Sequence, residues 1–380
     1  MINTQNRIRL TQFGKRLTNL SSKLTVGTST LTPLNYSDER EKFFSSDTYN
    51  PIFYYSKNDT SGLHKEVQSL LEELGEISLP NNLSYYFYNA LQSLSTDIDL
   101  IDAIGADSFA EIAADVFQYD TIDSNSLLQQ SANISFNEPR NCKLQCAEEM
   151  SKNFTKYIED LGIDYSVTID HFNDHIIRVG AKNLVIGAAV KRYCNNVERL
   201  IVHEVESHIL QRHNLKNAHN PLLRIIPRSH LSLWGEGLAV YNEISSGIIT
   251  RSAFETYYYR LRAVEKLEYS FREIFENLAQ YVNPEKAFMI TYRVKRGMGD
   301  TSQPGGYGKD AAYLMGYRKV SEYIANGGSI EFLYLSKYPQ IGELLLEHEM
   351  LEITPVLLPA YLKKQKTFSH QYTTPSSPLI

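Results

Sequence analysis

The chain has 380 residues, of which 42% are hydrophobic and 22% charged, and this ordinary globular composition allows one large domain or two smaller ones. The formal net charge of −6 provides no overall basic field, so we expect neither nucleic acid nor a membrane surface as a partner. The N-terminus lacks the apolar segment of a secretory signal, and the longest apolar run, 184–190, is too short to span a bilayer.

The cysteine content favours a reducing compartment. The chain has three cysteines, Cys142, Cys146 and Cys194, and such an odd, low number suits proteins that keep their thiols reduced. Cys142 and Cys146 have no second pair of cysteines or histidines nearby, so we expect small packed thiols rather than a structural zinc site. Together with the missing signal segment, this predicts a cytoplasmic protein.

The first part of the chain is expected to be helical. Residues 1–30 are polar with scattered leucines, which predicts a flexible N-terminal arm. Over 31–162, apolar residues recur at helical spacing and Gly or Pro residues mark several helix ends. The expected helices cover 37–44 with Ser37 as its cap, 63–75, a segment opening at Pro80, 98–117 and 143–161, and 119–135 is expected to be a loop.

The second part, 163–364, begins with a different pattern. Alternating apolar residues over 165–169, 175–179 and 184–186, separated by turn residues, predict a small β-meander. A helix over 196–213 follows, with Asn195 and Glu198 expected as its capping box. Further helices are expected from Trp234 to about 247 and over 251–281, 284–296, 310–324, 329–335, 341–353 and 355–363, before a flexible tail at 365–380.

These elements predict a mainly helical α+β fold, with the small sheet placed just before the 196–213 helix. We see no internal repeat and no convincing linker in the sequence. The simplest architecture is therefore a single domain over 31–364, with a helical part at 31–162 and a catalytic part at 163–364.

The 196–213 helix contains the pattern H-E-x-x-x-H, formed by His203, Glu204 and His208. It is one residue longer than the zinc-protease pattern H-E-x-x-H, in which two histidines bind zinc and the glutamate is the general base. In a regular helix, residues i and i+4 point roughly 40° apart, but i and i+5 point roughly 140° apart. The motif can therefore form a metal site only if the helix contains a π-type bulge, which we expect near 205–207. The alternative is a pair of ordinary polar residues on an amphipathic helix.

A third metal ligand is expected because catalytic zinc keeps three protein ligands and one open position. Glu236 is the natural candidate, since it follows His208 by one loop and a return helix and is flanked by Gly235 and Gly237. Alternatively, it is only a favourable negative charge near a helix N-terminus. Glu243 falls on the same helical face and could accept a hydrogen bond from a ligand histidine.

Two other patterns have simpler explanations. His348 and Glu352 are spaced as H-x-x-x-E in a leucine-rich helix without a companion ligand, so we interpret them as surface charge. The glycine-rich segment 297–308 lacks the Gly-Lys-Ser/Thr ending of a phosphate-binding loop and does not follow a strand.

Over roughly 31–350, the chain resembles the microtubule-associated tyrosine carboxypeptidase family, which has a QEGLA signature. The segment His203–His208 resembles the zinc helix of that family, and 234–239 resembles its E-G-L-A element, with Gly235 where the family usually has Gln. Residues 32–44 resemble the family's N-terminal entry, and 293–316 resemble its R-x-x-R-G and K-D-x-x-Y-L-x-G stretch.

The resemblance implies a zincin-like metallopeptidase of gluzincin type that removes a C-terminal tyrosine or similar aromatic residue from a protein or peptide tail. It implies one Zn²⁺ ion held by His203, His208 and Glu236, with Glu204 as catalytic base. Such an enzyme also needs a cation for the substrate carboxylate and a donor for the oxyanion. The candidate cations are Arg293, Arg296 and Lys309, and the candidate donors are Tyr241, Tyr307, Tyr313 and His230. Tyr313 is also expected among the substrate-binding residues.

Two other classes of function remain open at this point. A zinc endopeptidase or dipeptidyl peptidase would use the same motif without a carboxylate clamp. A non-catalytic protein of the same fold could keep the zinc site alone.

Overall fold

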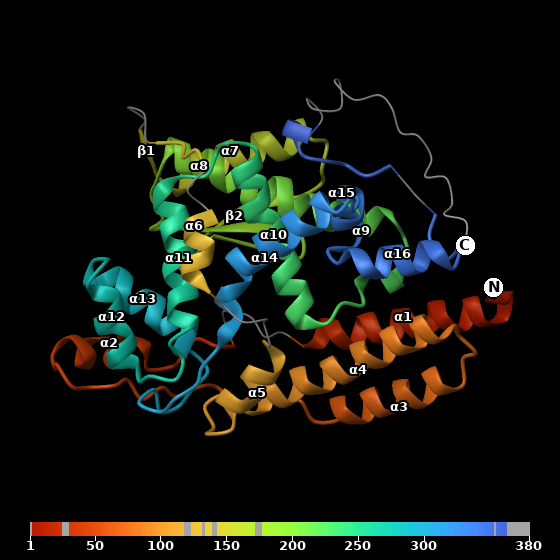
Figure 1. Ribbon diagram of the computed structural model, residues 1–380, viewed down its shortest axis with the longest axis horizontal. Helices are drawn as coiled ribbons and strands as arrows, with labels where there is room; N and C mark the ends of the chain where they lie inside the picture. The colour runs from red at the N-terminus through yellow and green to blue at the C-terminus, as the bar shows by residue number, and fades with distance from the viewer. Residues whose placement is uncertain are drawn as a thin grey trace.

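The structure is a computed structural model, and it describes residues 2–24, 30–117, 123–130, 134–138, 143–171, 177–352 and 355–362. Helices surround a small sheet, and the helix pair α10 (Arg228–Ser245) and α14 (Ala312–Ala325) lies at the centre of the molecule (Figure 1). The predicted mainly helical α+β fold is confirmed. None of the described helices is both long and apolar enough to cross a membrane.

The N-terminal helices form a layer along one edge of the molecule, red to orange in Figure 1. This layer contains α1 (Thr4–Lys23), α3 (Leu63–Gly75), α4 (Asn81–Asp102) and α5 (Phe109–Val116). Residues 4–23 are a packed helix rather than the flexible arm that their polar composition suggested. Leu10 and Phe13 of α1 are fully buried, and the Phe13 ring meets that of Phe87 edge to face at 5.8 Å.

Two helix boundaries in this part differ from expectation. The segment 98–117 is not one helix, because the chain turns between α4 and α5 at Gly105, whose φ of 84° is left-handed. Helix α2 (Tyr36–Phe44) begins one residue before Ser37, after Asn35. A short helix, α6 (Ser124–Gln130), lies inside the expected loop.

The sheet has the expected place but not the expected connectivity. Its strands β2 (Ser166–Asp170), β3 (Ile177–Val179) and β4 (Asn183–Gly187) have the order β2-β4-β3, with β2 parallel and β3 antiparallel to β4. The meander prediction is therefore wrong. The nearly continuous apolar run of β4 buries it at the centre, between the two strands that precede it. A second pair joins β1 (Leu144–Gln145) to β5 (Arg192–Tyr193), and α7 (Ala147–Asp160) follows β1.

The expected 196–213 helix is a continuous series of three helical segments. These are α8 (Cys194–Leu200), the π-helix η2 (Ile201–Ile209) and α9 (Leu210–Asn217). Tyr193, not Asn195, occupies the N-cap position, so the capping-box prediction is wrong. A 3₁₀ turn, η3 (Pro221–Arg224), then leads to α10.

The remaining helices complete the second half of the chain. They are α11 (Arg251–Val264), α12 (Phe271–Ala279), α13 (Pro284–Lys295), η4 (Gly308–Ala311), α15 (Ile330–Ser336) and α16 (Pro339–Glu347). Helices α11 and η4 pack against α14, while α15 packs against α9. The predicted single helix over 251–281 is wrong, because Ser270 and Glu273 form a capping box that starts α12 separately. Of the segment 355–363, only 360–362 are helical among the described residues.

The cysteines correct one further expectation. Cys146 is a free thiol, but Cys194 is disulfide-bonded. The expectation that all three cysteines are reduced is therefore wrong for Cys194. Cys142 and the predicted flexible tail at 365–380 lie outside the described residues.

Candidate functional site

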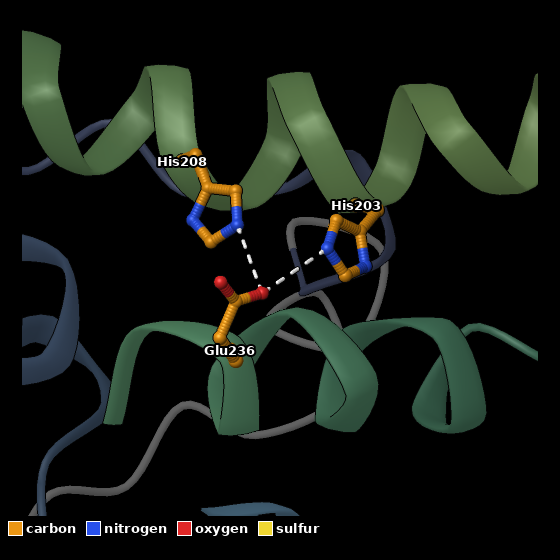
Figure 2. A group of neighbouring side chains, drawn as sticks. All are labelled: His203, His208 and Glu236. Carbon is orange, nitrogen blue, oxygen red and sulfur yellow. Dashed lines mark ion pairs between the residues drawn. The ribbon is translucent and has the colours of Figure 1, made fainter. Parts of the chain in front are cut away.

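The π-helix η2 brings the two histidines of the H-E-x-x-x-H pattern together. It covers all nine residues from Ile201 to Ile209, so the predicted π-type distortion is confirmed and is longer than a single bulge. A π-helix has i→i+5 hydrogen bonding, which returns residues five apart to one face. Figure 2 shows His203 and His208 projecting from η2 toward α10, with ring centroids 5.2 Å apart.

Buried polar groups hold η2 in this conformation. The Ser207 hydroxyl donates to the Val202 carbonyl at 3.0 Å, and it accepts from the Asn242 amide at 2.7 Å. The Glu206 carbonyl accepts from the Tyr334 hydroxyl at 2.8 Å. A buried polar group without a partner costs about 1–3 kcal/mol, so this network favours the π-helix over a regular helix that would displace it.

Helix α10 supplies the third side chain. Glu236 points up between the two imidazoles (Figure 2), with its Oε2 3.6 Å from Nε2 of His203 and 3.7 Å from Nε2 of His208. Because α10 begins at Arg228, Glu236 lies well inside the helix, and its position is not explained by the helix N-terminus. A Cβ on Gly237 would lie 2.2 Å from the Gly316 carbonyl carbon, so glycine here allows α10 and α14 to touch through their backbones.

The three side chains fit a zinc ion. One ligand atom from each of His203, His208 and Glu236 lies within 4.8 Å of the others, and this is the only such group among the described residues. Donors bound tetrahedrally to zinc at about 2.1 Å lie about 3.4 Å apart. The two measured distances to Glu236 exceed this by only a few tenths of an ångström, and two imidazoles with one carboxylate are a donor set typical of catalytic zinc.

The electrostatics of these groups are strongly coupled. Burial alone would lower the pKa of His203, but the carboxylates of Glu236 and Glu243 raise it to about 10 in the metal-free protein. Burial would raise the pKa of Glu236, but His203, His208 and Lys309 lower it well below its usual value. The site therefore concentrates negative charge that either protons or a bound cation can balance.

Glu204 lies next to His203 on η2. Burial raises the pKa of its carboxyl, and the neighbouring His203 and His208 oppose that rise. A half-buried carboxyl whose pKa is raised is suited to accept and return a proton. The structure thus places the candidate base beside the candidate ligands.

Glu243 contacts the far side of His203. Its Oε1 lies 2.6 Å from Nδ1 of His203, as the shared face with Glu236 predicted, and the carboxylate is fully buried. Arg199 and Tyr257 also donate to this oxygen, at 2.6 and 3.0 Å. Nδ1 is therefore directed at Glu243 while Nε2 is directed at Glu236.

The three predicted cations, Arg293, Arg296 and Lys309, do not all pair with the same carboxylate. Lys309 is nearest the ligands, with Nζ 3.8 Å from Oε1 of Glu236. Arg293 instead forms a bidentate pair with Asp310, in which its terminal nitrogen donates at 2.7 Å. Arg296 is also directed at Asp310, at 3.9 Å, and stacks over Tyr307 with its Cζ 5.0 Å from the ring centroid.

Of the four candidate oxyanion donors, Tyr313 is the one that a ring contact places beside a ligand. Its ring stacks on that of His203 at 6.4 Å and on that of Tyr257 at 4.9 Å. Tyr307 is buried against Phe109 and Phe117. His230 stacks on Tyr338 at 4.6 Å, and Tyr241 packs in the core beneath the sheet.

The two other sequence patterns have structural explanations. His348 lies at the end of α16 and bonds Asn82 at 2.9 Å, apart from the metal-type cluster. In the glycine-rich segment, a Cβ on Gly297 would lie 2.1 Å from the Phe109 ring, so this loop is packed against α5. Neither pattern adds a residue to the site.

Several residues at the site were missed at the level of sequence. Arg199 is four residues before His203 and therefore on the same helical face, which is a usable signal. Asp310 and Arg260 pair at 3.6 Å across η4 and α11, a contact that no local pattern indicates. Tyr257 is one of 26 tyrosines and begins a run of three, 257–259, a pattern more typical of half-buried packing residues than of a site.

The amino-acid sequence is similar to those of known proteins. Residues 41–371 match the family described as microtubule-associated tyrosine carboxypeptidase. The mouse protein named microtubule-associated tyrosine carboxypeptidase 1 is 26% identical over 365 residues, which cover 92% of this chain and 68% of the mouse protein. The human protein of the same name is 24% identical over 328 residues, covering 84% of this chain and 60% of the human protein. The match to the rat protein is 28% identical over 188 residues, covering 46% of this chain and 38% of the rat protein. Since the family match covers most of the sequence, the chain belongs to the microtubule-associated tyrosine carboxypeptidase family.

Proposed function

We propose that the protein is a zinc-dependent carboxypeptidase that removes a C-terminal tyrosine, or another aromatic residue, from a protein or peptide tail. The observation that supports this most strongly is the convergence of His203, His208 and Glu236 with Lys309 beside them. The names of the relatives support the same reaction class. The relatives are longer than this chain, which covers 68% of the mouse protein and 60% of the human protein. Action on a protein tail and a cytoplasmic location are therefore stated for this chain as parts of the proposal.

In this proposal the ion is held by Nε2 of both histidines and by the Glu236 carboxylate. When bound, zinc lowers the pKa of a water molecule and polarises the scissile carbonyl. Glu204 accepts the proton of the attacking water and returns it to the leaving amine. Its position next to His203 and the raised pKa of its half-buried carboxyl support that role.

The substrate carboxylate is held by Lys309. Three cations, Arg260, Arg293 and Arg296, pair with the single carboxylate of Asp310, and Lys309 pairs with Glu236, so these four cations outnumber the two carboxylates that they face. Arg293 is already committed to Asp310 through two hydrogen bonds. A dication at the three ligands would compete with Lys309 for Glu236, which leaves the lysine charge for a substrate carboxylate.

The aromatic side chain of the substrate is recognised by Tyr313. Its ring lies in contact with His203 and carries the Arg260 guanidinium 5.1 Å from its centroid. An aromatic pair in a stacked or edge-to-face arrangement contributes about 0.5–1.5 kcal/mol beyond the burial of its surface area. In addition, a Cβ on Gly235 meets no atom within 4 Å, so there is space beside Glu236 where the family usually has Gln.

A pair of matched peptides tests the proposal. A peptide ending in Tyr is incubated with zinc-loaded protein as the free acid and as the C-terminal amide, and products are identified by mass. Loss of one tyrosine from the free acid alone is expected. Internal cleavage, or cleavage of both peptides, would instead indicate an endopeptidase or dipeptidyl peptidase. No cleavage by zinc-loaded protein would indicate a non-catalytic binding protein.

A further inference from the structure

We propose that Arg199 and Tyr257 are positioning residues for the metal centre, because they fix Glu243 and through it the ring of His203. The inference rests on the proposed zinc site but concerns residues outside the ligand set. Arg199 has no hydrogen bond to His203, His208 or Glu236 in the described part of the chain. The Tyr257 hydroxyl lies 3.4 Å from Nδ1 of His203, away from the Nε2 that faces Glu236. Their effect is expected on the orientation of His203 and on the affinity of the site for a metal.

A single oxygen atom of Glu243 accepts all of that carboxylate's hydrogen bonds from the described residues. Oε1 of Glu243 receives Nδ1 of His203 at 2.6 Å, a guanidinium nitrogen of Arg199 at 2.6 Å and the Tyr257 hydroxyl at 3.0 Å. The other oxygen, Oε2, is buried and has no hydrogen-bond partner among the described residues. Removal of one donor therefore loosens the only anchored end of the carboxylate.

Arg199 is itself firmly held. It precedes His203 by one helical turn, its side chain is 10% exposed, and its Nε donates to Asn196 at 2.9 Å. The same guanidinium nitrogen that reaches Glu243 also contacts the Tyr257 hydroxyl at 3.0 Å. Arg199, Tyr257 and Glu243 thus form a closed triangle from α8, α11 and α10.

This triangle selects one orientation of the imidazole. With Nδ1–H donated to Glu243, the lone pair of His203 is on Nε2, which faces Glu236. Partners that orient ligand histidines in this way raise metal affinity, and their loss typically costs 10–100-fold. A free Glu243 side chain would let the ring rotate away from the other two ligands.

Charge balance assigns Arg199 a second contribution. Glu204, Glu236 and Glu243 place three carboxylates around two histidines in a buried region. Lys309 pairs with Glu236 at 3.8 Å, whereas Arg199 is the cation that pairs with the buried Glu243, at 2.6 Å. Without Arg199, the buried Glu243 charge would be uncompensated even in the metal-bound protein, which is costly in a low-dielectric setting.

Tyr257 connects the triangle to the substrate side. Its ring lies parallel to that of Tyr313, at a centroid distance of 4.9 Å and an interplanar angle of 11°. Tyr257 therefore contacts both the anchor of His203 and the residue proposed to recognise the substrate ring. Removing only its hydroxyl should affect the first contact and leave the second.

Zinc affinity, measured by competition with a chelator, tests the inference without any peptidase assay. The variants are Arg199→Met, Arg199→Lys and Tyr257→Phe in the full chain. The matched controls on α11 are Arg251→Met, whose ion pair with Glu138 is exposed, and Tyr258→Phe, whose hydroxyl has no hydrogen bond among the described residues. Absorption of the cobalt-substituted proteins reports the ligand geometry in parallel.

We expect Arg199→Met to weaken zinc binding by about 10–100-fold and Tyr257→Phe by a smaller factor, with altered cobalt spectra. Arg199→Lys should recover most of the affinity because it keeps the charge, and both controls should match the parent. The inference is overturned if Arg199→Met and Tyr257→Phe only lower the melting temperature while zinc affinity and cobalt spectra stay unchanged. Should the parent chain bind no zinc, the proposed function fails together with the inference.

Discussion

Glu204 and Glu243 both interact with His203, yet the protein gives their carboxyl groups opposite properties. Burial raises the pKa of Glu204, and no hydrogen bond of the described residues offsets it. Burial acts in the same direction on Glu243, but Arg199 and His203 lower its pKa overall. Neighbouring carboxylates with divergent pKa shifts are typical of sites that divide proton transfer from charge stabilisation.

The first prediction at this scale concerns Glu204. Replacement by Gln keeps the shape of the side chain but removes its ability to take a proton. We expect zinc content to stay at one ion per chain and turnover of the tyrosine-ended peptide to fall at least 10²-fold, which is the usual contribution of a general base. Metal analysis and initial rates on the same sample check this. Retained turnover would exclude Glu204 as the base.

Under the proposed function, Lys309 is the residue that distinguishes a carboxypeptidase from other zinc peptidases. Lys309→Met removes the ammonium group 3.8 Å from Glu236 and keeps a side chain of similar length. Loss of one charged hydrogen bond of about 1.5–3 kcal/mol predicts a decrease in kcat/KM of about 10- to 100-fold for the free-acid peptide. Lys23→Met on α1, which removes an exposed ion pair with Glu66, is the control. Equal rates for Lys309→Met and the control would assign the carboxylate to another residue.

At the scale of elements, the site depends on the π-helical conformation of η2 and on the close approach of α10 to α14. The π-helix η2 aligns the histidines, and α10 approaches α14 closely enough that glycines are required. The H-E-x-x-x-H spacing predicted the π-helix, because a regular helix would separate His203 from His208. The close helix contact was indicated by Gly235 and Gly237, but only the structure shows which glycine is needed.

The glycines flanking Glu236 give a matched pair of variants. Gly237→Ala places a methyl group 2.2 Å from the Gly316 backbone, so we expect a loss of about 1–3 kcal/mol in the free energy of unfolding and weaker zinc binding. Gly235→Ala meets no atom within 4 Å and should stabilise α10 by roughly 0.5–1 kcal/mol. Urea unfolding of both variants checks the difference. If the two variants have equal stability, close packing of α10 on α14 is not what Gly237 provides.

Other elements show why sequence patterns were insufficient. Asn195 and Glu198 have the spacing of a capping box. However, the helix starts at Cys194, directly after strand β5, so Asn195 already lies inside its first turn. The true capping box of Ser270 and Glu273 was hidden inside a long run of helix-forming residues. Strand order could not be deduced either, since the parallel pairing of β2 with β4 is decided by long-range packing rather than by the turns between them.

At the scale of the whole molecule, the fold class and the convergence of His203, His208 and Glu236 could be predicted, but the support around these three residues could not. His203, His208 and Glu236 follow a motif whose spacing has chemical meaning. Tyr257 and Asp310 act through tertiary contacts that leave no local signature, and for Arg199 the only signal is its place four residues before His203. The packed helix α1 was missed for a similar reason, because its buried face is visible only once α3 and α4 cover it.

The N-terminal layer is also attached to the site. Arg228, the first residue of α10, donates to the buried Asp97 of α4 at 2.6 Å. This ion pair anchors the start of the helix that carries Glu236, eight residues further on. The N-terminal layer is thus joined to the rest of the molecule through the helix that carries Glu236.

The central claim is that one zinc ion binds to His203, His208 and Glu236, and anomalous scattering from zinc-soaked crystals measured at the zinc edge tests it most directly. We predict a single strong peak about 2.0–2.2 Å from Nε2 of both histidines and from a Glu236 carboxylate oxygen. His208→Ala crystals should lose that peak. A peak at other residues, or none in the zinc-soaked parent protein, would contradict the account.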